Sequence, residues 1–333
     1  MSKKTKEMLL EVKDLRVQYN TDAGEVYAVN GLNIEIEKRH TLGLVGETGA
    51  GKTTTALSIL NLVPNPPGVI TAGQIFLDGQ NVLSMSEAEL EKMRGNDVAM
   101  IFQDPMTALN PVMTVGEQIA ESVMLHNELS EAEALEHAKE MLKMVGIDEG
   151  RAGDYPHQFS GGMRQRVVIA IALACKPRLL IADEPTTALD VTIQAQVLVL
   201  IKQLIANSDM SLLLITHDLG VVAEICDEVA VMYSGQIVEK GTADDVFNHR
   251  LHPYTEGLFN SLPNLRERGE ELQPIKGMMP NPMDPIVGCS FAPRCQYATD
   301  RCFHEIPRLQ SMSETHFVAC HRFDDKAIGQ RGR

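Results

Sequence analysis

Short apolar pieces with alternating polar positions are separated by turn residues in residues 9–36, and Asp22-Ala23-Gly24 marks a hairpin. The pieces are Leu9–Val12, Leu15–Tyr19, Val26–Val29 and Leu32–Ile36. A period of two is typical of antiparallel strands that bury one face and expose the other. The first part of the chain is therefore expected to form an antiparallel β subdomain.

From residue 41 onward, short apolar runs of strand length alternate with stretches that can form helices. The expected strands are Thr41–Val45, Gln74–Leu77, Val98–Phe102, Leu179–Ala182 and Leu212–Thr216, with a hairpin over Val229–Tyr233 and Gln236–Glu239. This alternation predicts a mostly parallel sheet, which binds ligands at the carboxyl ends of its strands. Gly46, Gln103, Asp183 and His217 each follow such a strand, so one sheet edge is expected to gather them.

One stretch departs from this alternation, because its apolar positions recur at helical spacing. Val115 and Ile119 begin one such series, and a second series follows it. Ser130 is followed three residues later by Glu133, which is the pattern of a capping box at a helix start. These helices are expected to form an inserted helical subdomain at about residues 104–160.

The overall composition is that of an ordinary globular protein, but its net charge is −15. Sequence-independent nucleic-acid binding needs a basic surface, so no nucleic-acid partner is expected. No apolar run approaches the length that spans a bilayer, and no apolar segment follows the basic Met1–Lys6. The protein is therefore expected in the cytoplasm, where it would serve a membrane by docking onto other subunits.

The clearest chemical motif is a glycine-rich loop between a predicted strand and a predicted helix. The motif comprises Gly46, Glu47, Thr48, Gly49, Ala50, Gly51, Lys52 and Thr53, and Thr54 follows it. Its pattern G-x-x-x-x-G-K-T is that of the P-loop, in which backbone N–H groups and a helix N-terminus surround phosphates. Lys52 is expected to reach the β- and γ-phosphates of a nucleotide, and Thr53 to bind Mg²⁺. The alternative, a glycine-rich turn of another α/β protein, is disfavoured by the flanking strand and helix.

Two carboxylates follow the predicted strand Leu179–Ala182. Asp183 is expected to hold Mg²⁺ through water, because Mg²⁺ prefers carboxylate oxygens and keeps most of its hydration. Glu184 is expected to orient and deprotonate the attacking water. Such a pair is usually only solvated or helix-capping, but a P-loop in the same chain favours the catalytic role. Tyr19, at a strand end, is preferred for stacking on the nucleobase, with Tyr27 as the alternative.

A second candidate phosphate site precedes a predicted helix upstream of these carboxylates. Phe159-Ser160-Gly161-Gly162-Met163 resembles the signature of ABC ATPases, which usually reads Leu-Ser-Gly-Gly-Gln. The resemblance implies that Ser160, Gly161 and Gly162 contact ATP held by a second subunit, because two ABC subunits pack head to tail around the nucleotide. Met163 stands where the family usually has glutamine, and this departure is not expected to abolish binding by backbone N–H groups.

Other ABC elements occur in family order. Thr187-Ala188-Leu189-Asp190 resembles the D-loop, so Asp190 is expected near the nucleotide. Gln103 resembles the Q-loop glutamine, which implies a role near Mg²⁺ and the γ-phosphate, and His217 resembles the switch histidine.

Longer stretches narrow the resemblance to the ATPases of oligopeptide, dipeptide and nickel permeases. These stretches are residues 102–111, residues 182–196, His252-Pro253-Tyr254-Thr255 and Ser261-Leu262-Pro263, within a similarity from about Leu9 to His321. The resemblance implies ATP-driven peptide import at the cytoplasmic face of the membrane, with nickel or glutathione as alternative solutes. The implied partners are two transmembrane permease subunits, a second ATPase subunit and, indirectly, an extracytoplasmic peptide-binding protein. DNA-repair and translation ATPases are less favoured, because the chain has one P-loop and no sustained heptad run.

Four cysteines lie near the end of the sequence and have the spacing C-x5-C-x6-C-x17-C. They are Cys289, Cys295, Cys302 and Cys320. Disulfides are rare in the cytoplasm, whereas four thiolates suit an iron–sulfur cluster or structural zinc. The C-x2-C spacing typical of zinc is missing, and the C-terminal extension of the permease ATPases carries this cysteine pattern, so a [4Fe–4S] cluster is favoured. Zinc and unligated thiols remain alternatives, with His316 and His321 as substitute ligands.

The patterns and the resemblance together predict an α/β P-loop (RecA-like) ABC nucleotide-binding domain. It is expected to have an antiparallel β subdomain, an inserted α-helical subdomain and a small cysteine-containing C-terminal extension. The expected boundaries are residues 7–250 for the ATPase domain and residues 251–333 for the extension. The expected cofactors are ATP, Mg²⁺ and the [4Fe–4S] cluster.

Overall fold

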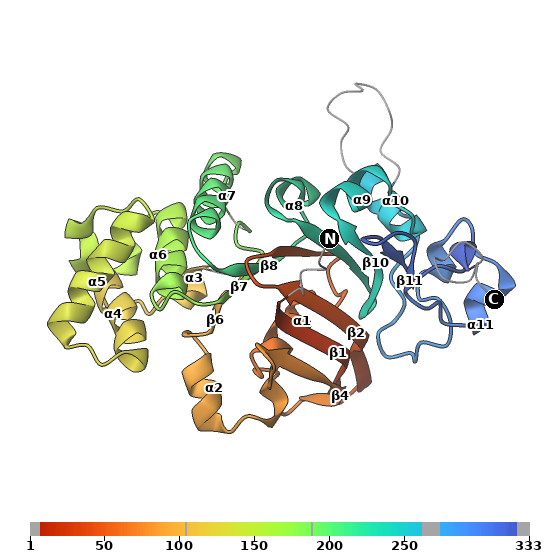
Figure 1. Cartoon of the computed structure of the whole chain (residues 1–333), viewed down its shortest axis with the longest axis horizontal. Helices are drawn as coiled ribbons and strands as arrows, with labels where there is room; N and C mark the ends of the chain where they lie inside the picture. Colours follow the sequence, from red (N-terminus) through yellow and green to blue (C-terminus); the bar gives the residue numbers. More distant parts are fainter. Residues whose placement is uncertain (1–6, 104, 188, 262–273, 325–333) are drawn as a thin grey trace, which may run out of the picture. The chain divides into compact units, whose positions relative to one another are not determined.

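The computed structural model describes residues 7–103, 105–187, 189–261 and 274–324 (Figure 1). Four residues of the motifs named above lie outside the described residues, namely Asp104, Ala188, Leu262 and Pro263. The chain divides into two compact units. Unit 1 comprises Met1–Leu10, Ile36–Thr41 and Leu77–Thr216, and unit 2 comprises Glu11–Glu35, Leu42–Phe76 and His217–Arg333.

Three parallel strands form the centre of unit 1. β7 (Leu179–Asp183) lies between β6 (Val98–Ile101) and β8 (Ser211–Thr216). Every residue of β7 and β8 is buried, which explains why both strands read as nearly continuous apolar runs. Because the three strands are parallel, the residues that follow them are delivered to one edge of the sheet.

Helices account for most of the remainder of unit 1. They are α2 (Glu87–Met93), α3 (Pro105–Ala108), α4 (Val115–His126), α5 (Glu131–Met144), α6 (Gly161–Leu173) and α7 (Val191–Ala206), and the short strand β5 (Gln80–Asn81) precedes them. α5 packs against both α4 and α6 (Figure 1). Capping boxes begin α4 and α5, the second being Ser130 with Glu133. The helices expected from the apolar spacing are thereby confirmed.

The first strands of the chain are longer than the sequence predicts. β1 (Met8–Thr21), β2 (Gly24–Glu37) and β4 (Gly68–Leu77) are neighbours in the order β2-β1-β4. The expected short pieces merge into two strands of 14 residues each. Asp14 and Gly31, with φ of 45° and 81°, interrupt the apolar alternation without ending the strands.

In unit 2, five strands of the eight-stranded sheet are neighbours in the order β11-β12-β10-β9-β3. β3 (Thr41–Val45) is parallel to β9 (Glu228–Tyr233), which forms the predicted hairpin with β10 (Gln236–Thr242). β12 (Phe317–Val318) pairs antiparallel with β10 and with β11 (Gln310–Ser311). The helices of unit 2 are α1 (Lys52–Ile59), α8 (Leu219–Ile225), α9 (Ala243–Asn248), α10 (Pro253–Asn260) and α11 (Asp300–His304).

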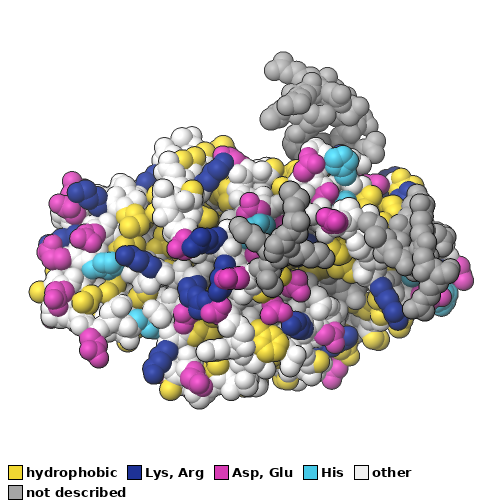
Figure 2. Space-filling view, in the orientation of Figure 1, with side chains coloured by type: hydrophobic (Ala, Val, Ile, Leu, Met, Phe, Trp, Pro, Cys, Tyr) yellow, Lys and Arg dark blue, Asp and Glu magenta, His cyan; other side chains and the backbone are white. Residues whose placement is uncertain are grey.

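The predicted domain boundary at residue 250 stays a prediction, since unit 2 contains the P-loop together with the segments on both sides of that position. Within the described ranges, none of the helices has the length and apolar character needed to cross a bilayer. Among the described residues on the face shown in Figure 2, acidic and basic side chains are interspersed.

Candidate nucleotide-binding site

The glycine-rich loop joins β3 to α1, as the sequence predicts. Helix α1 begins at Lys52, and its N-cap residue Gly51 has a φ of 102°. A Cβ at Gly51 would also collide with the carbonyl oxygen of Ala28, so this position requires glycine. The Lys52 side chain donates to the carbonyl oxygens of Gly46 at 2.7 Å and Glu47 at 3.1 Å. The lysine therefore lies across the loop, which is where it is expected to meet phosphates.

The rest of the loop offers backbone groups and hydroxyls around the start of α1. Thr48 and Gly49 form its exposed tip, whereas Ala50 is buried and accepts a hydrogen bond from the backbone N–H of the β9–β10 turn at 2.8 Å. Thr53 and Thr54 belong to the first turn of α1, which no side chain caps. An uncapped helix N-terminus suits a phosphate group.

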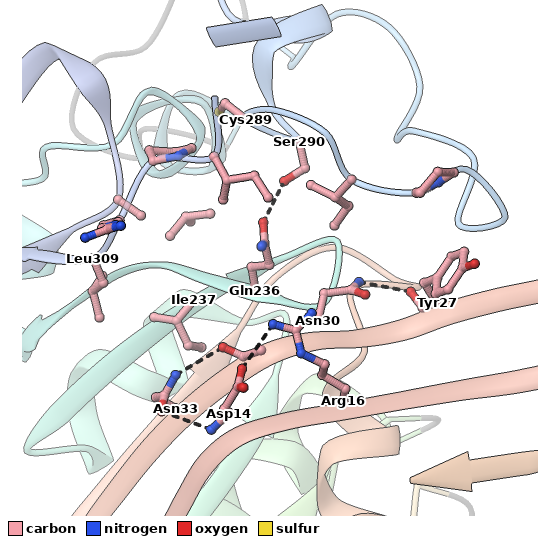
Figure 3. A pocket seen from close by; sticks show the side chains of 18 residues that line it. Asp14, Arg16, Tyr27, Asn30, Asn33, Gln236, Ile237, Cys289, Ser290 and Leu309 are labelled. Carbon is pink, nitrogen blue, oxygen red and sulfur yellow. Dashed lines mark hydrogen bonds and ion pairs between the residues drawn. The ribbon is translucent and has the colours of Figure 1, made fainter. Parts of the chain in front are cut away.

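The two tyrosines that the sequence offers for base stacking, Tyr19 and Tyr27, have different surroundings in the structure. The hydroxyl of Tyr19 lies 3.4 Å from Oγ1 of Thr54. Tyr27 instead donates to the carboxylate of Glu25 at 2.9 Å and lines a cavity of about 590 Å³ next to Asn30 (Figure 3). Of the two, Tyr19 is therefore the residue beside the start of α1, and its stacking role stays a prediction.

Glu47 of the loop has two partners from the C-terminal part of unit 2. The guanidinium of Arg294 donates to its two carboxylate oxygens at 2.7 and 3.1 Å, and the backbone N–H of Glu47 donates to the Tyr254 hydroxyl at 2.8 Å. The hydrogen bonds that Arg294 donates to Glu47 hold the pKa of Arg294 above its usual range, and burial raises the pKa of Tyr254. The sequence does not predict the Arg294 contact, because a lone arginine 247 positions away carries no signal for this loop.

The two carboxylates at the end of β7 belong to unit 1. Asp183 is 2% exposed, and Glu184 follows it in a left-handed conformation with φ of 46°. The side-chain amide of Gln103 donates to Oε2 of Glu184 at 3.3 Å, and the hydroxyl of Thr187 donates to the same oxygen at 2.7 Å. The ends of β6 and β7 thus bring Gln103 and Glu184 together, as their positions after strands predict. Mg²⁺ binding by Asp183, Gln103 and Thr53 stays a prediction.

The signature segment begins α6. Ser160 is the N-cap residue, and its hydroxyl accepts the backbone N–H of Met163 at 3.4 Å. A Cβ at Gly162 would collide with the side chain of Ile193 in α7, whereas a Cβ at Gly161 would have its nearest neighbour 3.9 Å away. The close approach of α7 therefore explains the second glycine in structural terms, and ATP binding by this segment stays a prediction.

Asp190 and His217 are the remaining residues predicted for the nucleotide site. Asp190 caps α7 by accepting the backbone N–H of Ile193 at 3.0 Å, which is a structural use of its carboxylate. His217 lines a cavity of about 340 Å³ in unit 2 together with Gly46 and Glu47 of the P-loop. The structure thus places the P-loop, Tyr19 and His217 in unit 2, and the other predicted nucleotide-site residues in unit 1.

The four C-terminal cysteines lie near one another in unit 2. The backbone N–H of Cys289 donates to the carbonyl oxygen of Cys302 at 2.7 Å. Burial raises the pKa of Cys289 to about 11, and also raises the pKa values of Cys295 and Cys320, with smaller contributions from the neighbouring thiols. However, no group of three or more His, Cys, Asp or Glu side chains in the described part of the chain is arranged to hold a metal ion. The geometry therefore does not support the predicted [4Fe–4S] cluster.

The histidines considered as substitute ligands have other partners. Nε2 of His316 lies 2.8 Å from the Glu239 carboxylate, and Nδ1 of His321 lies 3.1 Å from that of Asp324. Both rings are thereby oriented by carboxylates rather than by the cysteines.

Comparison with known proteins identifies the family of the chain. Residues 29–187 match the family model "ABC transporter", and residues 238–302 match "Oligopeptide/dipeptide transporter, C-terminal region". The oligopeptide transport ATP-binding protein OppD of Bacillus subtilis is 51% identical over 93% of this chain and 87% of its own length. The dipeptide transport ATP-binding protein DppD of the same organism is 48% identical over 96% of both chains.

Solved structures show the same fold. A dimeric ATP-binding cassette in a post-hydrolysis state, bound to ADP and Pi, matches 70% of this chain and 98% of its own, with a TM-score of 0.63 and 28% identity. The similarity to full-length relatives covers nearly the entire chain. The protein belongs to the ABC transporter family, among the oligopeptide and dipeptide transport ATP-binding proteins.

Proposed function

We propose that this ABC ATPase powers the uptake of dipeptides or oligopeptides by an ABC importer. The observation that carries the proposal is the high identity to OppD and DppD over almost the full length of each chain. By this proposal the protein acts at the cytoplasmic face of the membrane, bound to two transmembrane permease subunits. A second ATPase subunit would complete each nucleotide site, and an extracytoplasmic binding protein would deliver the peptide.

The proposed chemistry is the hydrolysis of MgATP. The P-loop binds the phosphates through its N–H groups and Lys52, and the Thr53 hydroxyl and the Asp183 carboxylate suit Mg²⁺, which prefers oxygen ligands. Glu184 takes the proton of the attacking water, and the amide of Gln103, which donates to Glu184, helps to hold that carboxylate in place.

His217 is proposed to contact the γ-phosphate, and its support is the cavity that it lines with Gly46 and Glu47. Ser160, Gly161 and Gly162 are proposed to bind the nucleotide of the second subunit, with Asp190 next to that interface. Their support is the position of Ser160 and the glycines at the start of α6, where helix N–H groups suit phosphate oxygens.

The role of Glu184 has a direct test. In the assembled transporter, Glu184→Gln should keep MgATP binding and lower the ATP turnover rate at least about a hundredfold, because a general base is lost. Glu121→Gln is the matched control, since Glu121 is an exposed glutamate of the same unit. Full turnover by Glu184→Gln would remove Glu184 from the mechanism.

The transported solute is tested separately. Reconstituted into vesicles with its permease subunits and binding protein, the ATPase should drive ATP-dependent accumulation of labelled dipeptides or oligopeptides. Accumulation of nickel or glutathione instead would keep the ATPase assignment and overturn the peptide assignment.

The role of the cysteines is a further part of the proposal. A [4Fe–4S] cluster is proposed from the spacing of the four cysteines alone, because the described side chains are not arranged to hold a metal ion. Iron and sulfide analysis of anaerobically purified protein, together with its visible absorbance, tests the cluster. Stoichiometric zinc would favour the structural alternative, and neither metal would leave the thiols unligated.

A further inference from the structure

Arg294 and Tyr254, both in the segment after residue 250, contact Glu47 of the P-loop. Arg294 donates to both carboxylate oxygens of Glu47, to the Tyr233 hydroxyl at 3.3 Å and to the carbonyl oxygen of Lys276 at 3.2 Å. Its side chain is only 6% exposed, against 29% for Glu47. A bidentate arginine–carboxylate pair of this kind fixes orientation as well as charge.

Tyr254 holds the same residue from the backbone side. Its hydroxyl accepts the N–H of Glu47, and its ring is fully buried against Tyr233 and Phe291, with centroids 4.5 and 5.4 Å apart. Phe291 and Arg294 lie three residues apart around a short 3₁₀ turn, so one turn of the C-terminal segment supplies both the packing and the guanidinium. Both the side chain and the main chain of Glu47 are therefore fixed.

These contacts bear on the groups that bind phosphate. The carbonyl oxygens of Gly46 and Glu47 hold the Lys52 amine, so the position of Glu47 also sets the position of Lys52. Glu47 adds a negative charge to a loop that must attract a polyphosphate. Arg294 neutralises this charge at a distance where Coulomb interactions remain strong.

We propose that Arg294 and Tyr254 are positioning residues for nucleotide binding, through which the C-terminal segment sets the conformation and the charge of the P-loop. The inference rests on the proposed role of the P-loop in binding MgATP. The segment after residue 250 would then have a function in the nucleotide site that does not depend on metal binding by the four cysteines.

The test compares MgATP dissociation constants and steady-state ATPase parameters of full-length variants. Arg294→Gln leaves the Glu47 charge without its partner, and it should weaken MgATP binding at least about tenfold, with KM rising and kcat at saturating MgATP changing less than threefold. In the double variant Glu47→Gln with Arg294→Gln the charge is also removed, so a large part of the affinity should return. Arg301→Gln is the matched control, because Arg301 pairs with Glu305 and Asp324 in the same segment and is half exposed.

A purely structural role predicts a different result. It would lower the melting temperature of Arg294→Gln and leave the MgATP affinity of the folded fraction equal to that of the wild type, which would overturn the inference. If Arg294→Gln does not fold, Tyr254→Phe decides, because it removes only the hydroxyl. That variant should bind MgATP at least threefold more weakly, and unchanged affinity would overturn the inference. Failure of the wild type itself to bind MgATP would refute the proposed function instead.

Discussion

Glu239 is a buried carboxylate whose removal should destabilise unit 2 strongly. It lies in β10 and is 0% exposed. Its two oxygens accept the backbone N–H of Leu251 at 2.8 Å and of His252 at 2.9 Å, and Nε2 of His316 lies 2.8 Å from one of them. One side chain thus joins the sheet to the start of α10 and to the C-terminal segment. The perturbation is Glu239→Gln, which keeps the shape and removes the charge.

The expected magnitude follows from this arrangement. A glutamine has one acceptor oxygen, so whichever way the amide faces, its NH₂ group points at a donor and leaves at least one buried N–H group without an acceptor. A buried unsatisfied donor costs about 1–3 kcal/mol, and the remaining hydrogen bonds lose their charge assistance. We therefore expect a loss of about 2–4 kcal/mol in the free energy of unfolding of unit 2.

Urea titration followed by far-UV circular dichroism measures this loss, and hydrogen exchange of residues 310–320 shows whether the C-terminal strands open first. Glu228→Gln is the control in the same hairpin, because Glu228 pairs with Lys240 at 3.2 Å with both side chains about one-fifth exposed. An accessible ion pair of that kind contributes about 0–1 kcal/mol. If Glu239→Gln loses no more stability than Glu228→Gln, the reasoning about the buried acceptor is wrong.

Two further predictions follow from the packing of α6 and from a buried histidine. Gly162→Ala should lose about 1–3 kcal/mol through collision with α7, whereas Gly161→Ala should stay within about 0.5 kcal/mol of the wild type, and thermal unfolding of both variants checks this. Burial lowers the pKa of His252 to about 4, so the folded protein keeps this ring neutral. The unfolded chain binds the proton near pH 6.5, so stability is complete above that value and falls by about 3 kcal/mol as the pH drops towards 4. Urea midpoints between pH 7.5 and 4.5 should show this fall, and His252→Asn should flatten it.

The local parts of the nucleotide site could be predicted because their chemistry lies within a few adjacent residues. A helix next to the glycine-rich loop follows from the helix-forming run after the motif, and the structure has α1 there, beginning at Lys52. The contact between Gln103 and Glu184 spans 81 positions, yet it was foreseeable, because both residues end neighbouring parallel strands. A sequence pattern therefore predicts a long-range contact only where both residues follow neighbouring strands of a regular sheet.

The contacts that the sequence could not reveal are those made by irregular segments. Arg294 lies on a single 3₁₀ turn, and the only chemical pattern around it is that of the cysteines, including Cys295, which predicts metal ligation instead. The sequence predicts β1 and β2 as shorter strands for a related reason. Asp14 and Gly31 are residue types that favour turns, but here they only interrupt the strands. In each case the outcome depends on what packs against the residue, and a single sequence does not contain that information.

The segment after residue 250 makes two contacts with carboxylates that precede it in unit 2, and the predicted domain boundary at residue 250 stays a prediction. Arg294 pairs with Glu47 of the P-loop, and His316 contacts Glu239 of the central hairpin. Glu239 is fully buried, and Glu47 is 29% exposed but pairs with an arginine that is only 6% exposed. Removing one partner of a buried polar contact costs more than losing an exposed pair. Two such contacts, made by residues 22 positions apart in the extension, mean that the fold around the P-loop is stabilised by the extension. A cut at residue 250 would remove the partners of both carboxylates at once, so stability and nucleotide binding are expected to depend on the same segment.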